Sequence, residues 1–325
     1  MSGGGAQIEL NPEWLDRSSH IALLNQGFPG QWDRAAYDWY VARPFGGVAN
    51  DTFVVSHHER ALAAVTLCHR QVGAGGADTS RRIDVGVMSA GTTLRSEQGR
   101  GHYGRLLEAI REHACRKGYA ALLGFVTRDN ASARGLFRRG ARGIPSFYIV
   151  SVSGRGPRRR PVRHGAALGN LESLTKFREP ERAAVSLASL ARRESARMEG
   201  VRFLYERAHD WQQQFIARPN HVRALRLTHD CVALLETVRG SDRLQWLAAP
   251  REKMTASLAS LASASAAVGR QFFTYTLDPL IAAAAKRIGL AIRPGYLMLW
   301  PTGCDVDACR TIADAAWTVQ SGDRV

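Results

Sequence analysis

The chain has 325 residues, which exceeds the length of one average domain, so we expect two domains. Hydrophobic residues make up 45% of the chain and charged residues 22%, a composition that fits a globular protein and excludes a disordered one. The net charge of +15 favours an anionic partner. A phosphate-rich small molecule and a nucleic acid both satisfy that preference, and charge alone does not separate them.

Targeting and metal-binding signals are weak in this sequence. No apolar stretch approaches the roughly 20 residues that span a bilayer, and Met1–Ala6 lacks the pattern of a secretory signal. We therefore expect a short disordered N-terminal tail, no membrane partner and a cytoplasmic protein. The five cysteines are odd in number and irregularly spaced, which favours reduced, buried thiols over a disulfide framework. Cys304 and Cys309 have no second Cys/His pair nearby, so we expect no metal.

The first half alternates helical and strand patterns. Arg43-Pro44 ends the first helix, because the residue before a proline disfavours α geometry, and a polar turn at 57–60 indicates a hairpin. We interpret 72–78 as a Gly/Ala loop. In chain order we expect a helix at 32–41, strands at 52–55, 61–67 and 83–88, a helix at 101–116, a strand at 120–126, a helix at 131–139 and a strand at 147–152. This order predicts a mixed α/β layer.

The second half reads as a diverged copy of the first. Residues 40–44 (Tyr-Val-Ala-Arg-Pro) have a counterpart in 215–219 (Phe-Ile-Ala-Arg-Pro), and each segment closes a helix that contains a tryptophan. Hairpin-like strands, a helix, a strand at 272–276, a glycine-closed helix and an aromatic strand follow, as in the first half. Between the halves, 153–164 contains five arginines and two prolines, the composition of a solvated linker. We expect domains at 1–153 and 169–325, joined by a basic linker at 154–168.

One glycine-rich loop carries a chemical signal. The segment from Gln98 to Gly104 follows an expected strand and opens an expected helix. Glycines let a backbone approach a ligand, and the first turn of a helix offers unpaired N–H groups and a positive dipole end, which together suit a pyrophosphate. The spacing fits neither a Rossmann fingerprint nor a P-loop, because no Gly-Lys-Ser/Thr follows.

The longer pattern around this loop resembles the GNAT (N-acetyltransferase) superfamily. Motif A of that family is matched by Val87-Met88, Gln98-Gly99-Arg100-Gly101, Leu106-Leu107 and Gly118-Tyr119, and motif B by Asn130, Ala133, Leu136-Phe137 and Gly140. The resemblance covers residues 50–150 well and the second half weakly, through the repeat. It implies an α/β (mixed α+β) fold of two GNAT-like domains in tandem, each a twisted, mostly antiparallel sheet flanked by helices.

The resemblance also implies a binding site for acetyl-CoA or another acyl-CoA, used as co-substrate without a metal. Val87 and Met88 would bind the pantetheine arm on a strand that splays from its neighbour, and Asn130 would contact the arm or cap the helix that it precedes. The residues implied in cofactor binding are Val87, Met88, Gln98, Gly99, Arg100, Gly101, His102, Tyr103, Gly104 and Asn130.

Two departures from the family pattern bear on catalysis. Phe137 stands where many members have a tyrosine that protonates the departing thiolate, and 89–97 is longer than the usual connection between strand and loop. Tyr103 occupies a position where small residues are common, so it is either a wall of the acyl pocket or a replacement proton donor. Asp84, at the start of the Val87 strand, is our candidate base for an amine nucleophile, and its alternative is a solvent-facing strand end.

These observations predict an acyl-CoA-dependent N-acyltransferase that acetylates a small-molecule amine by direct attack in a ternary complex. The second half lacks the loop, because 249–254 contains no glycine, so we expect one CoA site per chain. One alternative is a Fem-like aminoacyl-tRNA-dependent transferase, with tRNA as partner. Another is a non-catalytic acyl-CoA sensor. The acceptor, the acyl length and the oligomeric state are not predicted.

Overall fold

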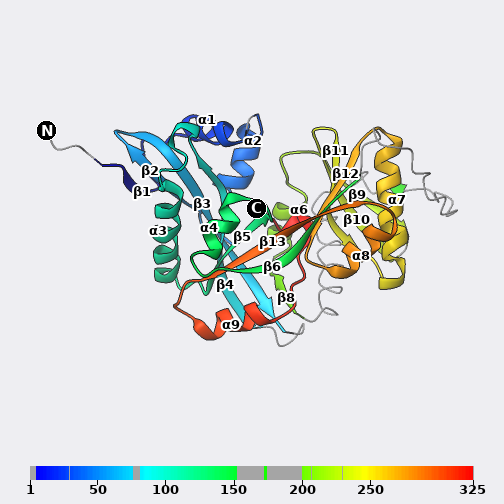
Figure 1. Cartoon of the computed structure of the whole chain (residues 1–325). Coiled ribbons are helices and arrows are strands. Elements are labelled where there is room, and N and C mark those ends of the chain that lie inside the picture. Colours follow the sequence, from blue (N-terminus) through cyan, green and yellow to red (C-terminus); the bar gives the residue numbers. More distant parts are fainter. Residues whose placement is uncertain are drawn as a thin grey trace.

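The computed structural model describes residues 5–28, 30–75, 81–151, 172–173, 200–205, 207–228 and 230–324. The expected basic linker at 154–168 lies outside these residues, as does most of the expected N-terminal tail. Figure 1 shows two lobes side by side, with most of the first half of the chain on the left, most of the second on the right and the C-terminus between them.

The first half follows the expected order of elements, with additions at its start. Its elements are β1 (Gln7–Leu10), α1 (Arg17–Gly27), α2 (Arg34–Tyr37) continued by a π-helical turn (Asp38–Ala42), β2 (Asp51–His57), β3 (Arg60–Ala74), β4 (Arg81–Thr93), a 3₁₀ turn (Arg95–Glu97), α3 (His102–Arg116), β5 (Ala121–Thr127), α4 (Ala131–Phe137) and β6 (Arg142–Val150). The hairpin between β2 and β3 is confirmed, and its turn residues His58 and Glu59 have positive φ angles of 50° and 53°.

The second half repeats this order after two short strands. Its elements are β7 (Glu172–Ser173), β8 (Val201–Phe203), α6 (Ala208–Phe215), β9 (Val222–Thr228), β10 (Cys231–Val238), β11 (Ser241–Ala248), a 3₁₀ turn (Arg251–Lys253), α7 (Met254–Ala267), β12 (Gln271–Thr276), α8 (Pro279–Arg287), β13 (Ala291–Pro301), α9 (Val306–Asp314) and a last 3₁₀ turn (Ser321–Asp323).

Two expectations about the loops of the first half need correction. β3 runs on to Ala74, through the first three residues of the expected Gly/Ala loop at 72–78, because it pairs there with both β4 and β8. Residues 76–78 of that loop lie outside the described residues. The long connection at 89–97 is also mostly strand: β4 continues to Thr93 past an irregularity at Ala90, whose φ is 50°. A bulge places an extra residue on one strand and bends it, which makes this segment look too long in the sequence.

The two halves exchange their last strands within one sheet. Its order is β1-β2-β3-β4-β5-β13-β6-β12-β11-β10-β9-β7, with β8 on the edge of β3. β13, the last strand of the second half, therefore lies between β5 and β6, and β6 lies between β13 and β12. In Figure 1 these two long strands cross from one lobe to the other. Each lobe is thus completed by a strand of the other half.

The repeat is also visible in the parallel strand pairs. β4 pairs in parallel with β5 and β11 with β12, whereas the other pairs are antiparallel. Near the end of each parallel pairing, the antiparallel register of the preceding strand pair shifts. The shift lies at Ala64/Thr66 between β3 and β4, and at Leu234/Leu235 between β10 and β11. Such an irregularity at matching places supports the duplication inferred from the helix ends.

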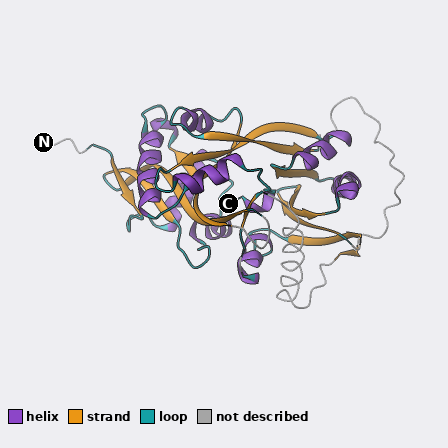
Figure 2. Ribbon diagram, turned by 90° about the horizontal axis from the view of Figure 1, so that it is seen from below, coloured by secondary structure: helices purple, strands orange, loops and turns teal. Residues whose placement is uncertain are grey.

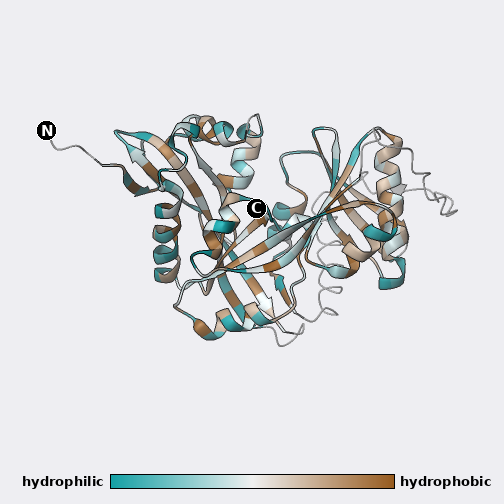
Figure 3. Ribbon diagram, viewed as in Figure 1, coloured by the Kyte–Doolittle hydropathy of each residue, from teal (hydrophilic) through white to brown (hydrophobic). Residues whose placement is uncertain are grey.

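Helices cover both faces of the sheet, as Figure 2 shows from below. On one face α3 and α4 bury a core that includes Leu106, Ile110 and Leu136. On the other face α9 covers a second core with Ile312, and Phe203 of β8 belongs to the same core. The outward side of α3 is mostly hydrophilic in Figure 3, as expected of a helix with one apolar stripe.

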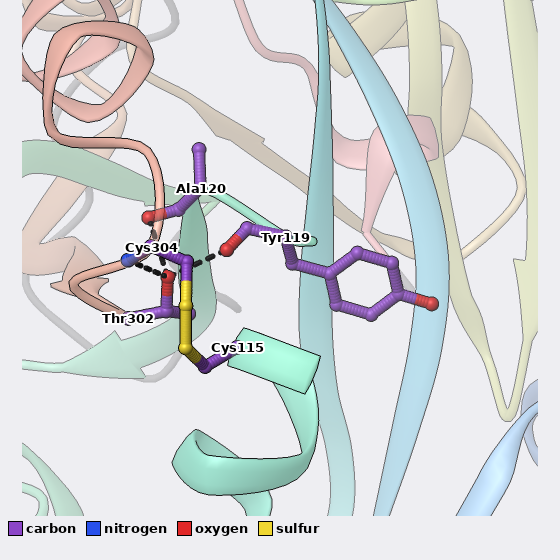
Figure 4. The surroundings of a disulfide bond; sticks show 5 residues. All are labelled: Cys115, Tyr119, Ala120, Thr302 and Cys304. Carbon is purple, nitrogen blue, oxygen red and sulfur yellow. Dashed lines mark hydrogen bonds between the residues drawn. A yellow bond between two sulfur atoms is a disulfide. The ribbon is translucent and has the colours of Figure 1, made fainter. Parts of the chain in front are cut away.

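Two cysteines correct the expectation of reduced thiols. Cys115, at the end of α3, and Cys304, after β13, form a disulfide with their Cα atoms 5.5 Å apart (Figure 4). Beside it, the Thr302 hydroxyl donates to the carbonyl oxygens of Tyr119 and Ala120 at 2.6 and 3.2 Å. The bond spans 189 residues, so no spacing rule could reveal it. The free cysteines among the described residues, Cys68, Cys231 and Cys309, are buried.

Candidate active site

The site begins where β4 and β5 separate; we call the gap between the two strands beyond their last paired residues the splay. The two strands pair in parallel from Val85 to Val87 on β4, opposite Ala121 to Leu123 on β5, and the pairing ends there. Beyond this point β4 continues to Thr93 and β5 to Thr127, so the strands diverge toward the start of α3. The expected splay at Val87 and Met88 is present in this geometry.

Val87 and Met88 face opposite sides of the sheet, as neighbours on a strand must. Val87 is fully buried in the core under α9. Met88 is half-buried on the α3 face, and its Cε would lie 3.6 Å from a Cβ placed on Gly124 of β5. Its side chain therefore reaches across the splay toward β5.

The loop from Gln98 to Gly104 opens α3 without a side-chain cap. Gly99 and Gly101 both have a φ of 83°, a left-handed conformation that favours glycine. Gly101 is the N-cap and no side chain bonds to the first turn, whereas Asn130 caps α4. Gln98, Gly99, Arg100 and Gly101 are exposed. No side-chain acceptor therefore occupies the first-turn N–H groups, an arrangement that suits an anion.

Charged side chains surround this turn. Glu97 lies 3.2 Å from Nε2 of the buried His102 and 3.4 Å from the Arg100 guanidinium. Arg139, at the end of α4, lies directly over Gly104, where a Cβ would come within 2.5 Å of its Nη2. Arg139 also binds the Glu108 carboxylate at 2.9 Å. Its cation and the helix dipole together favour an anion at this turn.

Asn130 is confirmed as a helix cap. Its side chain accepts a hydrogen bond from the Ser132 backbone N–H at 2.8 Å, and its exposed position is at the open end of the splay, between β5 and α4. A contact with a pantetheine arm stays a prediction.

Tyr103 points from the first turn of α3 into the splay. A Cβ on Gly91 of β4 would lie 3.3 Å from its Cε2 and 3.6 Å from its hydroxyl oxygen. Burial raises the pKa of Tyr103, and the nearby Ser132 side chain opposes that rise. The ring therefore spans from α3 to β4 on one side and α4 on the other.

Asp84 lies at the beginning of the parallel pairing, four residues before Met88 and on the same face of β4. Its carboxylate accepts a hydrogen bond from Gln71 at 2.9 Å and lies 3.8 Å from Nε2 of His69. Between Asp84 and Met88, the space over Gly86 is filled by Leu67, Leu122 and Tyr119. The catalytic role of Asp84 stays a prediction.

A cavity adjoins His69 and Gln71, the two side chains that contact Asp84. It has a volume of about 250 Å³ and is lined by His69, Gln71, Phe45, Gly46, Val48, Leu204, Arg207 and Asp210. Burial lowers the pKa of His69, while Asp84 partly opposes that shift. The imidazole is therefore held toward its neutral form, which accepts protons.

Three side chains of the candidate site were not found from the sequence. Arg139 and His69 are single basic residues with no motif around them. Tyr296 reaches the first-half site from β13, where its ring packs edge-on against Phe137 with centroids 5.4 Å apart. Only the exchange of strands brings Tyr296 there. A lone aromatic residue in a core strand gives no signal of this placement.

The splay of the second half is occupied by the chain itself. β11 and β12 pair from Ser241 to Leu244 and then part. Beyond that point the Gln320 side chain accepts a hydrogen bond from the Leu247 N–H at 2.7 Å and donates one to its carbonyl at 3.0 Å. The strand end of β12 also meets this segment, through a bridge between Thr276 and Gln320. The open backbone groups that a second pantetheine arm would need are already paired.

Solved structures share this fold at low sequence identity. The tandem GNAT protein from the clavulanic acid biosynthesis pathway matches with a TM-score of 0.58 and 16% identity, over 91% of this chain and 99% of its own. A GCN5-related N-acetyltransferase from Anabaena variabilis matches with a TM-score of 0.57 and 12% identity, over 91% and 73%. Eis1 from Mycobacterium abscessus gives 0.52 and 13%, over 91% and 74%. No protein-family model and no curated protein matches the sequence.

The chain therefore has the GNAT fold in its tandem form, which confirms the fold expected from the motifs. Within the part of the chain that the structure describes, no helix is long and apolar enough to cross a membrane. The same residues contain no group of three or more His, Cys, Asp or Glu side chains arranged to hold a metal ion.

Proposed function

We propose that the protein is an acyl-CoA-dependent N-acyltransferase whose donor site is the splay between β4 and β5. The observation that carries this proposal is the uncapped, glycine-led start of α3 at the open end of that splay. This turn offers N–H donors and the positive end of a helix to the pyrophosphate, and Arg139 adds a cation over Gly104. Acetyl-CoA is the donor we propose.

The acceptor would be a small-molecule amine, bound on the side of the His69 cavity. The amine attacks the thioester carbonyl, a C–N bond forms, the C–S bond breaks, and the CoA thiolate leaves. Asp84 would take the amine proton, through a water or through His69, because Leu67, Leu122 and Tyr119 separate it from Met88. The thiolate is a fair leaving group, since a free thiol has a pKa of roughly 8.5, and water would protonate it.

The assay that tests this proposal measures thiol release from acetyl-CoA in the presence of a panel of amines. We expect release that depends on an added amine, and its loss in Gly101→Val, which obstructs the loop. CoA binding without release for any amine would instead favour the sensor. Acyl transfer from a charged tRNA by a protein that does not bind CoA would favour the tRNA-dependent enzyme.

A further inference from the structure

The Tyr103 side chain packs closely against its neighbours within the splay. On β4 the ring lies against Gly91, where any Cβ would come within 3.3 Å of Cε2, a distance tighter than ordinary contact. Glycine at position 91 therefore makes room for the ring beside the bulge.

On its other side the Tyr103 ring faces α4. Ser132, in the first turn of that helix, lies close enough to the Tyr103 side chain to lower its pKa. The ring also packs on the core that α3 shares with the sheet. One side chain thus connects α3, β4 and α4, the three elements that meet at the open end of the splay.

Met88 fills the deeper part of the same space. Its Cε would lie 3.6 Å from a Cβ on Gly124, an ordinary contact distance, so Met88 reaches across the splay to β5. Methionine is unbranched and adapts readily to a new neighbour. A tyrosine ring has two rotatable bonds and moves as a rigid plane, so Tyr103 is the larger obstacle.

We propose that Tyr103 is a gate that competes with the pantetheine arm for the splay between β4 and β5, an inference that rests on the proposed acyl-CoA site. The arm enters only after the ring leaves Gly91 and Ser132. The closed ring then lowers the apparent affinity for CoA by the fraction of molecules in the open form. Tyr103 thereby sets how strongly the donor is held.

The test is calorimetric titration with CoA of the full chain and four variants. Tyr103→Gly removes the ring, and we expect it to bind CoA at least about tenfold more tightly than the unmodified chain, equivalent to about 1.4 kcal/mol. Tyr103→Phe and Ser132→Ala keep the ring but remove the interaction between the two side chains, so both should tighten binding by a smaller factor. Tyr37→Phe removes a tyrosine hydroxyl that bonds His20 in α1 and should not change the affinity. Thermal unfolding shows whether each variant is folded.

The outcomes separate the gate from the donor site. Equal or weaker binding by Tyr103→Gly, with CoA still bound by the unmodified chain, would overturn the gate and leave the proposed function standing. Tighter binding by Tyr37→Phe would also overturn it, because the effect would not be specific to Tyr103. No binding by the unmodified chain or by any folded variant would overturn the proposed function, and the gate with it.

Discussion

The rings of Phe137 on α4 and Tyr296 on β13 meet edge to face, with centroids 5.4 Å apart and planes at 88°. Gly143 of β6 leaves room for both: a Cβ there would lie 2.7 Å from Cζ of Phe137 and 2.9 Å from Cδ1 of Tyr296. The tip of Phe137 therefore points over β6, two strands away from β5 in the sheet. The contact of α4 with the exchanged strand β13 therefore sets the direction of the Phe137 side chain.

This contact predicts that Phe137→Tyr will not restore a proton donor. The added hydroxyl would lie over Gly143 and not in the splay, so we expect kcat to change by less than about threefold, against the roughly 100-fold or more typical of a working general acid. Steady-state kinetics with a responsive amine measures this. A gain of 100-fold would show that the ring turns toward the thioester during turnover.

Asp84→Asn tests the proposed base. We expect kcat to fall by about 100-fold, the lower end for proton transfer, with little change in acyl-CoA affinity, the pattern of an interaction made mainly in the transition state. If the variant keeps the original rate, Asp84 is a strand-end residue that only orients Gln71.

Gln320→Met tests the occupied splay of the second half. Methionine keeps the volume but loses both hydrogen bonds to Leu247, and a buried backbone group left unpaired costs about 1–3 kcal/mol. We expect the free energy of unfolding to fall by that amount in urea titrations. An unchanged unfolding curve would mean that water replaces the amide there.

The disulfide should be a measurable part of the stability. Cys115→Ser with Cys304→Ser releases α3 from the segment after β13, and we expect the unfolding free energy to fall by about 2–4 kcal/mol. A reductant should shift the urea midpoint of the unmodified chain but not that of the double variant. Identical curves for both chains would show that the bond contributes nothing to stability.

Because His20 is buried, we predict that the free energy of unfolding falls on acidification. Burial lowers the pKa of His20 to about 4, against about 6.5 when unfolded, so the unfolded chain binds more protons between these values. Stability present above pH 6.5 should therefore be lost as the pH falls toward 4, by up to about 3 kcal/mol. Urea unfolding of His20→Gln across this range should show a weaker pH dependence, and an unchanged slope would exclude His20 as its source.

Local patterns were enough to predict most of the fold. Periodicity and breakers located the helix that became α3 within a residue, and the polar turn after His57 located the β2–β3 hairpin. The exchange of β6 and β13 could not be predicted, because the two strands have similar patterns and their partners are set by contacts far apart in the sequence. The length of β4 was misjudged because an irregularity at Ala90 resembles a loop.

The candidate site divides in the same way. Glycine positions and the uncapped helix start are encoded locally, so the loop from Gln98 to Gly104 was found from its residues. The position of the Tyr103 ring depends on Gly91 and Ser132, which lie on different elements. Tyr296 comes from the second half of the chain. Side chains brought together by tertiary contacts leave no spacing signal.

We propose that one acyl-CoA binds per chain, at the start of α3 in the first half. Calorimetric titration of the unmodified chain and of Gly101→Val with acetyl-CoA measures both the number of sites and their affinity. We predict one site per chain and an affinity at least about tenfold weaker in Gly101→Val, because a side chain at Gly101 both strains its left-handed backbone and obstructs the pyrophosphate. Two equivalent sites, or an affinity that Gly101→Val leaves unchanged, would rule out a single donor site at this turn.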